Sequence, residues 1–465
     1  MFSPYVLTEY ASSARELGYA DIFPLSLTPF ELFLLADDRQ NYPMVFMVHL
    51  SFIGQIDPQA LEQAVRGAVV RNPLLRSKLV WTGSQPRWVL ANDDPPSVEW
   101  LTGIEIERGR QIHHIDLQKE NGLRVLAQAG LQQSDIYLQF HHACCDGNGA
   151  RRFIVDLLNG YASAFSPNLL ETKSDLLDYQ ALRTRGDFNV SNGSDKAHRK
   201  FSIWSRLRES CQFHLYTPKP ILTPTTSNNS LLCPTIYEHV FSAEESMRFR
   251  NCASRLQINV NDIALSLLFQ TLADWNKLYG CRDKDRLRVL MPIDLRSRSD
   301  ARMSAVNRMG YSFLSRTIIQ CNDLDSLMHG VCEETNYFKQ FQTGRDFLAS
   351  LDFARWIPGL LPLILGLPLS MATAILTNLG DPTRRFRRRF PSLGGAPVIG
   401  NVVLDYICGA PPIRSLTRAG FGICFSSGKM SISVAGDPAC LGKSTSDLLL
   451  SYVERWRNWS GVQRL

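Results

Sequence analysis

The chain has 465 residues with a formal net charge of +6, and 45% of its residues are hydrophobic and 20% are charged. Such a chain can bury a large core in two or three domains, which excludes an intrinsically disordered protein. The mild positive charge does not predict nucleic-acid binding, and eleven cysteines without regular spacing predict reduced thiols in the cytoplasm rather than a disulfide framework.

The N-terminal part predicts a strand followed by a capped helix. Residues 1–25 contain three acidic side chains and no long apolar run, so we do not expect a secretory signal. Residues 44–53 are typical of a strand. Asp57, with Pro58 at the first helical position, predicts a helix that ends before Asn72-Pro73.

The next segment is the most informative stretch of the chain. Residues 136–140 alternate as in a strand with one buried face, and His141 and His142 follow where that strand should end. Asp146-Gly147 then breaks the extended run, and residues 151–158 have apolar side chains at helical spacing. We therefore expect the histidines at the end of a rigid strand, where an imidazole is held in the fixed orientation that a general base needs.

The residues alone leave other interpretations of this stretch open. The two histidines could be a packed, hydrogen-bonded structural pair, because a second pair, His113-His114, lacks the Asp-Gly turn and predicts no chemistry. A metal site that includes Cys144 and Cys145 is a further alternative, but neighbouring ligands on one turn rarely satisfy tetrahedral geometry. A cysteine nucleophile is the third alternative, although Cys in a turn is usually a small apolar residue.

The pattern HHxxxDG in this stretch resembles the active-site motif of a superfamily of acyl-transferring enzymes. That superfamily includes chloramphenicol acetyltransferase, peptide-synthetase condensation domains, plant BAHD acyltransferases, polyketide-associated acyltransferases, wax ester synthases and alcohol acetyltransferases. The resemblance implies that His142 takes a proton from an alcohol or amine as it attacks a thioester, with His141 in the same catalytic motif. It also implies that Asp146 pairs with an arginine and holds the loop, and that Gly147 is the turn residue.

Other segments resemble the same superfamily in the same order, from residue 21 to about residue 459. Residues 24–26 (P-L-S) and 71–77 (R-N-P-L-L-R-S) match its opening, and residues 291–296 match a P-x-D-x-R segment. By this resemblance Arg296 is the candidate partner of Asp146, the alternative being a surface residue at a strand end. Residues 307–311 fit less well, because the usual Gly-Asn order is not kept.

The fold that the resemblance implies is α/β, with two chloramphenicol-acetyltransferase-like halves that form a V-shaped pseudo-dimer around a central cleft. We place the first half at 1–200, a linker rich in proline and polar residues at 201–234, and the second half at 235–465. The second half loosely repeats the first: a strand at 237–241 precedes a helix capped by Ser242, Asn261-Asp262 opens a long helix, and a hairpin at 420–434 precedes a closing helix at 447–459.

Two unusual segments follow one another along the second half of the sequence. Residues 356–376 carry no charge, but repeated prolines argue against a transmembrane helix. Their end, 375–381, resembles a strand that borders the active site, which makes Asn378 a candidate donor to the substrate or oxyanion; an Asn that ends a strand in a turn is the alternative. Arg384–Arg389 holds five arginines, which predicts a solvated loop, a site for coenzyme A phosphates, or a peripheral contact with anionic lipid headgroups.

Together these features predict a cytoplasmic acyltransferase, peripheral at the membrane in one interpretation. An acyl-CoA or acyl-carrier thioester is the expected co-substrate, without a tightly bound cofactor or a metal, and the acceptor is a small-molecule or lipid alcohol. A plant-type BAHD enzyme is disfavoured, because the chain lacks D-F-G-W-G. The alternatives are a condensation-type enzyme that forms an amide from a carrier protein, and an inert homologue that only binds. O-acyl transfer is favoured because no carrier or adenylation domain shares the chain.

Overall fold

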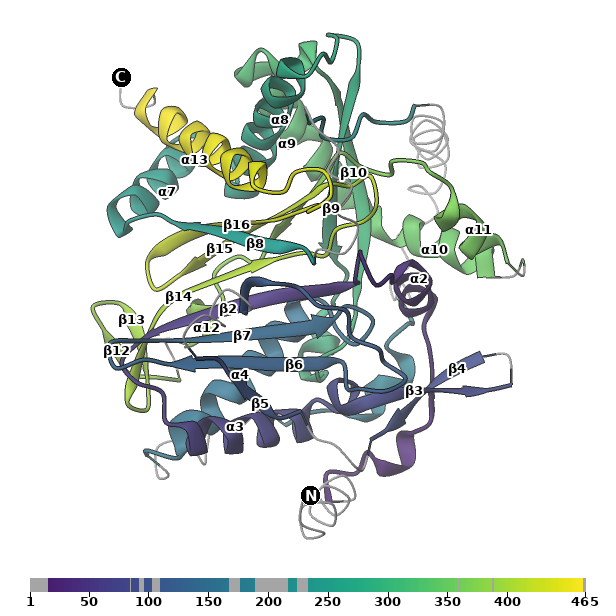
Figure 1. Ribbon diagram of the computed structural model, residues 1–465, viewed down its shortest axis with the longest axis vertical. Coiled ribbons are helices and arrows are strands. Elements are labelled where there is room, and N and C mark those ends of the chain that lie inside the picture. Colours follow the sequence, from purple (N-terminus) through teal and green to yellow (C-terminus); the bar gives the residue numbers. More distant parts are fainter. Residues whose placement is uncertain are drawn as a thin grey trace.

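The computed structural model describes residues 16–83, 85–91, 96–102, 109–166, 176–188, 216–223, 233–355, 357, 359–386 and 389–462. Within these residues the strands form a seven-stranded, a six-stranded and a three-stranded sheet. In Figure 1 the six-stranded sheet lies above the seven-stranded sheet, the two meet across the middle of the molecule, and most helices pack on the sides away from this junction. The chain therefore has two α/β halves, as the sequence predicted.

The seven-stranded sheet belongs mainly to the first half of the chain. Helices α3 (Pro58–Arg71) and α4 (Gly147–Ser163) pack against one another on its outer side (Figure 1). Its strand order is β12 (Ser392–Leu393), β13 (Ala396–Ile399), β14 (Val402–Ala410), β2 (Val45–Ile53), β7 (Gln133–His141), β6 (Leu123–Ala129) and β5 (Val98–Trp100).

The six-stranded sheet belongs to the second half. Its order is β10 (Met309–Thr317), β9 (Arg286–Asp294), β11 (Ala374–Asn378), β15 (Ala419–Ser426), β16 (Lys429–Gly436) and β8 (Thr235–Val240). The helices on its outer side are α7 (Ala243–Leu256), α8 (Val260–Leu278), α9 (Leu324–Phe341) and α13 (Ser444–Val462) (Figure 1).

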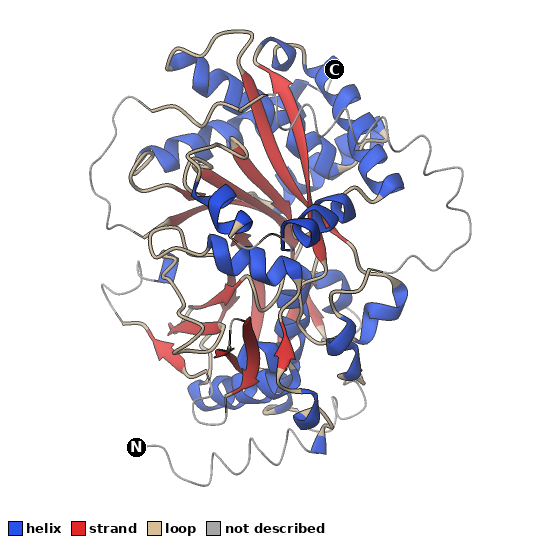
Figure 2. Ribbon diagram, turned by 90° about the vertical axis from the view of Figure 1, so that its right-hand side faces the viewer, coloured by secondary structure: helices blue, strands red, loops and turns tan. Residues whose placement is uncertain are grey.

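Smaller elements surround the level at which the halves meet. Helices α2 (Pro29–Asp37), α10 (Gly344–Arg355) and α11 (Leu360–Gly366) pack on one another on the right of Figure 1, the side that faces the viewer in Figure 2. The remaining elements are β1 (Leu25–Ser26), β3 (Ser77–Thr82) and β4 (Gln85–Leu90), the short helix α12 (Thr383–Phe386), and 3₁₀ turns at Ala20–Ile22, Pro73–Arg76, Gln180–Thr184, Arg298–Arg302 and Ile319–Cys321.

Helix starts follow the capping rules that the sequence analysis used. The Asp57 side chain accepts a hydrogen bond of 2.8 Å from the Ala60 N–H at the start of α3, as predicted. Ser242 and Glu245 form the predicted capping box of α7. The expected start of the next long helix at Asn261-Asp262 is wrong by one residue, because α8 begins at Val260 and its N-cap residue makes no side-chain hydrogen bond.

Strand β14 joins the two halves. It comes from the second half of the sequence but pairs antiparallel with β2 in the first sheet, with Cys408 opposite His49. At Gly422 of β15 the second sheet touches β14 so closely that a Cβ atom there would lie 1.7 Å from the Gly409 carbonyl oxygen. Only glycine fits this contact, and the Ser433 hydroxyl donates to the same oxygen at 2.5 Å.

The predicted boundary near 201–234 stays a prediction, since most of that linker lies outside the described residues. The uncharged segment 356–376 is divided between the end of the α10–α11 region and β11, and no helix in the described part of the chain is long and apolar enough to cross a membrane. Figure 1 shows α12, where the arginine-rich segment begins, on the opposite side from α11. Helices α11 and α12, one from each of these two segments, therefore lie on different sides of the molecule. Arg387 and Arg388 lie outside the described residues, and the predicted contact with phosphates or lipid headgroups stays a prediction.

A buried ionic cluster lies where four strands of both halves meet. The His49 imidazole on β2 lies 2.9 Å from an Asp135 carboxylate oxygen and 3.0 Å from a Glu238 oxygen. Tyr406 and Cys408 on β14 donate to Glu238. Burial opposes protonation of His49, but the two carboxylates more than offset burial and raise its pKa to about 9, while His49 helps to lower the pKa of Glu238 to about 2.

We expect this cluster to stabilise the fold most between about pH 4.5 and 6.5. The contribution of His49 is complete below its ordinary pKa of 6.5 and is lost as the pH rises through about 9. The contribution of Glu238 is complete above 4.5 and is lost as the pH falls through about 2. Since His49→Gln leaves buried carboxylates without their cation, it should lower the free energy of unfolding by about 3–5 kcal/mol at about pH 5.5.

Urea unfolding of the wild type and His49→Gln at about pH 5.5 and about pH 9.5 measures this difference. The loss should shrink at the higher pH, where the wild-type imidazole is also losing its proton. An equal loss at both pH values would contradict an ionic role for His49 and indicate packing alone.

Candidate active site

His142 lies one residue beyond the end of β7, and backbone contacts fix it from both halves. Its N–H donates to the Met44 carbonyl oxygen at 2.7 Å, which extends the pairing of β7 with β2. The Asn307 amide, from the second half, donates to the His142 carbonyl oxygen at 2.5 Å and to that of Ala143 at 3.1 Å. The structure therefore confirms that His142 lies at the end of the predicted strand. Hydrogen bonds from both halves fix its backbone there.

The His142 ring is almost enclosed, with 7% of the residue exposed. Phe46 packs edge-on at 5.1 Å between ring centroids, and Phe30 lies at 6.5 Å. Nδ1 is buried without a hydrogen bond of good geometry to a described residue, so Nε2 is the nitrogen open to the cavity. Burial lowers the pKa of His142, although nearby backbone groups and Asp146 act in the opposite direction. The ring is thus neutral at neutral pH, as a base must be.

His141 points away from the cavity and is fully buried. Its Nδ1 accepts a hydrogen bond of 3.1 Å from the Ala143 N–H, which places the proton of the neutral ring on Nε2. That nitrogen lies 3.3 Å from an Asp38 oxygen but outside good hydrogen-bond geometry. His114 of the other histidine pair lies 2.8 Å from the same carboxylate. His141 therefore contacts the turn and Asp38, the residue that follows α2, and does not line the cavity.

Asp146 receives four hydrogen bonds and is 2% exposed. Arg296 binds both carboxylate oxygens, at 2.8 and 2.9 Å, which confirms the pairing predicted across the two halves. The backbone N–H groups of Gly149 and Arg308 each donate at 2.8 Å. Burial alone would raise the pKa of Asp146, but Arg296 and the backbone donors more than offset it and lower that pKa.

Gly147 of the motif and Gly149, two residues later, differ in how tightly they are packed. Gly147 is the first residue of α4, and a Cβ atom there would meet only the end of the Leu379 side chain, at 3.0 Å. A Cβ atom at Gly149 would lie 2.8 Å from the Val306 carbonyl oxygen and 2.8 Å from the Cys145 Cβ. Gly149, rather than Gly147, is where the helix start and the second half meet most closely.

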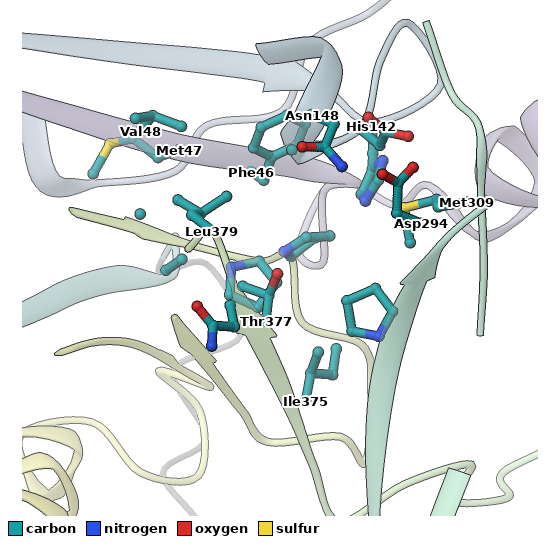
Figure 3. A pocket seen from close by; sticks show the side chains of 18 of the residues that line it. Phe46, Met47, Val48, His142, Asn148, Asp294, Met309, Ile375, Thr377 and Leu379 are labelled. Carbon is teal, nitrogen blue, oxygen red and sulfur yellow. The ribbon is translucent and has the colours of Figure 1, made fainter. Parts of the chain in front are cut away.

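A cavity of about 140 Å³ opens beside His142 at the junction of the two halves. Figure 3 shows Phe46 and His142 on one side of it, with Thr377 and Leu379 across from them. Most of its wall is apolar. The cavity is lined by Phe46, Met47, Val48, His142, Asp146, Gly147, Asn148, Pro292, Ile293, Asp294, Met309, Tyr311, Ile375, Thr377, Asn378, Leu379, Gly409, Ala410, Pro411 and Pro412.

Asn378 ends a strand in a turn, as one interpretation expected, while its role as a donor to the substrate or oxyanion stays a prediction. It ends β11, and its side-chain oxygen accepts a hydrogen bond of 2.8 Å from the Gly380 N–H, as expected of an asparagine in a turn. It also lines the cavity. Because the oxygen is held by the turn, the amide N–H₂ is the group left for a ligand.

The structure bears on two other interpretations of the motif, a cysteine nucleophile and a metal site. Cys144 and Cys145 are fully buried, and burial raises the pKa of both thiols well above its ordinary value, so neither is an activated nucleophile. Within the described residues, a group of three metal-ligand side chains gathers at His49, Glu238 and Cys408, not at the HHxxxDG motif.

Sequence reasoning missed three features of the site. Asn307 stood in a segment that matched the superfamily poorly, yet its amide holds the His142 carbonyl. Asp294 was noted only within the P-x-D-x-R segment, although it lines the cavity. The position of the Phe30 and Phe46 rings beside His142 had no signal other than the apolar pattern of their own elements.

Comparisons with known proteins agree with the superfamily resemblance at the level of fold. No protein-family model matches the chain. The chain is 21% identical over 395 residues to two uncharacterized proteins of Mycobacterium tuberculosis, from strains CDC 1551 and H37Rv, in alignments that cover 80% of this chain and 85% of each relative.

Three solved structures are similar over nearly the whole chain. The trichothecene 15-O-acetyltransferase TRI3 from Fusarium sporotrichioides has a TM-score of 0.66 at 12% identity, covering 93% of this chain and 94% of that one. Polyketide synthase associated protein 5 from Mycobacterium tuberculosis has 0.59 at 15%, covering 93% and 96%. A variant of the starter condensation domain of rhizomide synthetase, in complex with C8-CoA, has 0.61 at 14%, covering 95% and 94%. The fold is therefore that of the acyltransferases and condensation domains.

Because Gly149 is packed more tightly than Gly147, alanine at each position gives a matched pair of variants. Gly149→Ala forces a methyl group against the Val306 backbone, and we expect it to lower the free energy of unfolding by about 1–3 kcal/mol. The new methyl group in Gly147→Ala would meet only the flexible end of the Leu379 side chain. This variant should lower the free energy of unfolding by less than about half as much. Urea unfolding of both variants beside the wild type measures this, and a larger loss for Gly147→Ala would contradict the assigned packing.

Proposed function

We propose that the protein is an acyltransferase that moves an acyl group from a thioester to an alcohol or lipid-like acceptor. The single observation that carries this proposal is a buried, neutral imidazole, His142, with one ring nitrogen open to a cavity between two halves. The fold shared with acyltransferases and condensation domains supports it.

In the proposed reaction, the acceptor hydroxyl donates its proton to His142 Nε2 as its oxygen attacks the thioester carbonyl carbon. The carbonyl π electrons move to oxygen and give a tetrahedral oxyanion, for which the Asn378 amide is a candidate donor. When the oxyanion collapses, the carbon–sulfur bond breaks and the thiolate takes the proton from the imidazolium. The ester and free thiol leave, and neutral His142 is restored without a covalent enzyme intermediate.

Asp146 and Arg296 act in this proposal as positioning residues. Their ion pair occupies both carboxylate oxygens of Asp146 and fixes the turn between β7 and α4. His141 positions the same turn through the Ala143 N–H. These roles explain why the motif needs an acid and a second histidine that do not themselves move protons.

The donor is an acyl-CoA or a carrier-bound acyl group, and the complex of C8-CoA with the rhizomide starter domain supports the first. The mostly apolar wall of the cavity favours an apolar acyl chain or acceptor. Condensation-type amide formation is the second candidate, because a condensation domain is equally similar in fold. An inert binding homologue is disfavoured by the neutral, accessible ring of His142.

Replacing His142 tests the proposal directly. His142→Ala removes the proton acceptor, and we expect kcat/KM for acceptor-dependent release of free thiol from an acyl-CoA to fall by about 10²–10⁴-fold. His329→Ala is the control, because that side chain is 76% exposed on α9. An acyl-CoA panel with alcohols and matching amines separates ester formation from amide formation. Unchanged thiol release in His142→Ala would exclude this residue as the base.

In this proposal the pH dependence of kcat/KM follows from the protonation state of the His142 imidazole. Only the neutral ring accepts a proton, so kcat/KM should fall as the pH falls through the His142 pKa and stay level above it. Because burial lowers that pKa from 6.5, the midpoint of the acid limb should lie below pH 6.5. A kcat/KM profile across the acid range measures it. A midpoint above 6.5, or a profile without an acid limb, would contradict a buried neutral base.

A further inference from the structure

The charged side chains that line the cavity are all acidic among the described residues. Two carboxylates, Asp146 and Asp294, line it, whereas no lysine or arginine does so among the described residues. Arg296 binds both oxygens of Asp146, which also accepts from two backbone N–H groups, but only one oxygen of Asp294, so its single positive charge leaves one net negative charge on the two carboxylates. Asp294 therefore carries the negative charge that a bound molecule meets.

Asp294 is held rigidly but keeps one oxygen free. It is the last residue of β9 and pairs with Met309 of β10. One carboxylate oxygen, Oδ1, accepts hydrogen bonds from the Arg296 backbone N–H at 3.2 Å and from its guanidinium at 3.0 Å. Oδ2 accepts no hydrogen bond from a described residue, and the side chain is 45% exposed. The anchored oxygen fixes the direction in which the free one points.

The free oxygen shares the cavity with the proposed base. Figure 3 shows the Asp294 carboxylate directed toward the His142 ring, with Met309 beside it and the apolar side chains Phe46 and Leu379 farther along the wall. Because the Asp294 side chain is partly exposed, water can reach it when no ligand is bound. A ligand that displaces this water must offer a donor to Oδ2, since a ligand without one leaves the oxygen without a hydrogen bond.

We propose that Asp294 is a specificity-determining residue that binds a second donor group, a hydroxyl or an ammonium, next to the hydroxyl that His142 deprotonates. The acceptor class is then a vicinal diol or amino alcohol on an apolar chain. A carboxylate or phosphate at the same position of the acceptor is rejected, because Asp294 repels it and no cation lines the described wall. This inference rests on the proposed acyl transfer for its catalytic meaning, but ligand binding tests it separately.

A matched set of ligands isolates the second group. The probes are 1-octanol, 1,2-octanediol, 1-amino-2-octanol and 2-hydroxyoctanoate, and binding to the full chain is measured by ligand-detected NMR titration. Asp294→Asn keeps the oxygen that accepts from Arg296, but it removes the charge and replaces the free oxygen, Oδ2, with an amide N–H₂ that donates instead of accepting. Asp283→Asn, at an exposed position before β9, is the control. Thermal unfolding of each variant verifies that it is folded.

We expect the wild type and Asp283→Asn to bind the diol and the amino alcohol about tenfold more tightly than octanol, and Asp294→Asn to lose most of this preference for the amino alcohol. In acyl-CoA assays the same variant should raise KM for these acceptors with little change in kcat, and should improve kcat/KM for the hydroxy acid. Affinities that do not favour the diol or amino alcohol in the wild type, including a failure to bind any probe, overturn the inference.

The binding and kinetic measurements distinguish two kinds of failure. If the preference for the amino alcohol depends on Asp294 but no acyl group is transferred, the proposed function fails and the binding role of Asp294 stands. If octanol and the diol are acylated equally well and Asp294→Asn affects both alike, the acyltransferase stands and the specificity role is overturned.

Discussion

The bidentate ion pair between Asp146 and Arg296 is the interaction on which the rest of the site depends. Asp146 also accepts from the first turn of α4 and from the Arg308 backbone, so one carboxylate joins the helix start of the first half to the β9–β10 region of the second. Buried ion pairs often add little net stability, but removal of one partner leaves an uncompensated charge. The pair therefore specifies how the halves meet rather than merely strengthening the contact.

Two further contacts between the halves act on other sides of His142. Asn307 binds the backbone that carries the imidazole, and the His49 cluster joins β2 and β7 to β8 and β14. The cavity lies among these contacts, with β14 and the residues after it contributing one wall. Because its backbone is held from both halves, the His142 imidazole keeps its orientation without a hydrogen-bond partner of good geometry on Nδ1 among the described residues.

Local sequence signals predicted the parts of the site that depend on short-range rules. The alternation before His142 and the apolar spacing after Asp146 gave β7 and α4, and the cap at Asp57 gave the start of α3. The pairing with Arg296 came from resemblance, since a contact between residues 150 positions apart has no local signal. For the same reason the entry of β14 into the first sheet and the role of Asn307 were not predicted: both depend on tertiary packing.

The course of β14 also constrains how the site can move. The chain leaves the second sheet after β11, adds β14 to the first sheet, and returns to the second sheet as β15. Opening the halves like a hinge would require the hydrogen bonds between β14 and β2 to break, or the backbones at Gly409 and Gly422 to separate. A wide separation of the two halves would therefore disrupt strand pairing or close backbone packing, so smaller side-chain and loop movements are the motions that leave this interlaced frame intact.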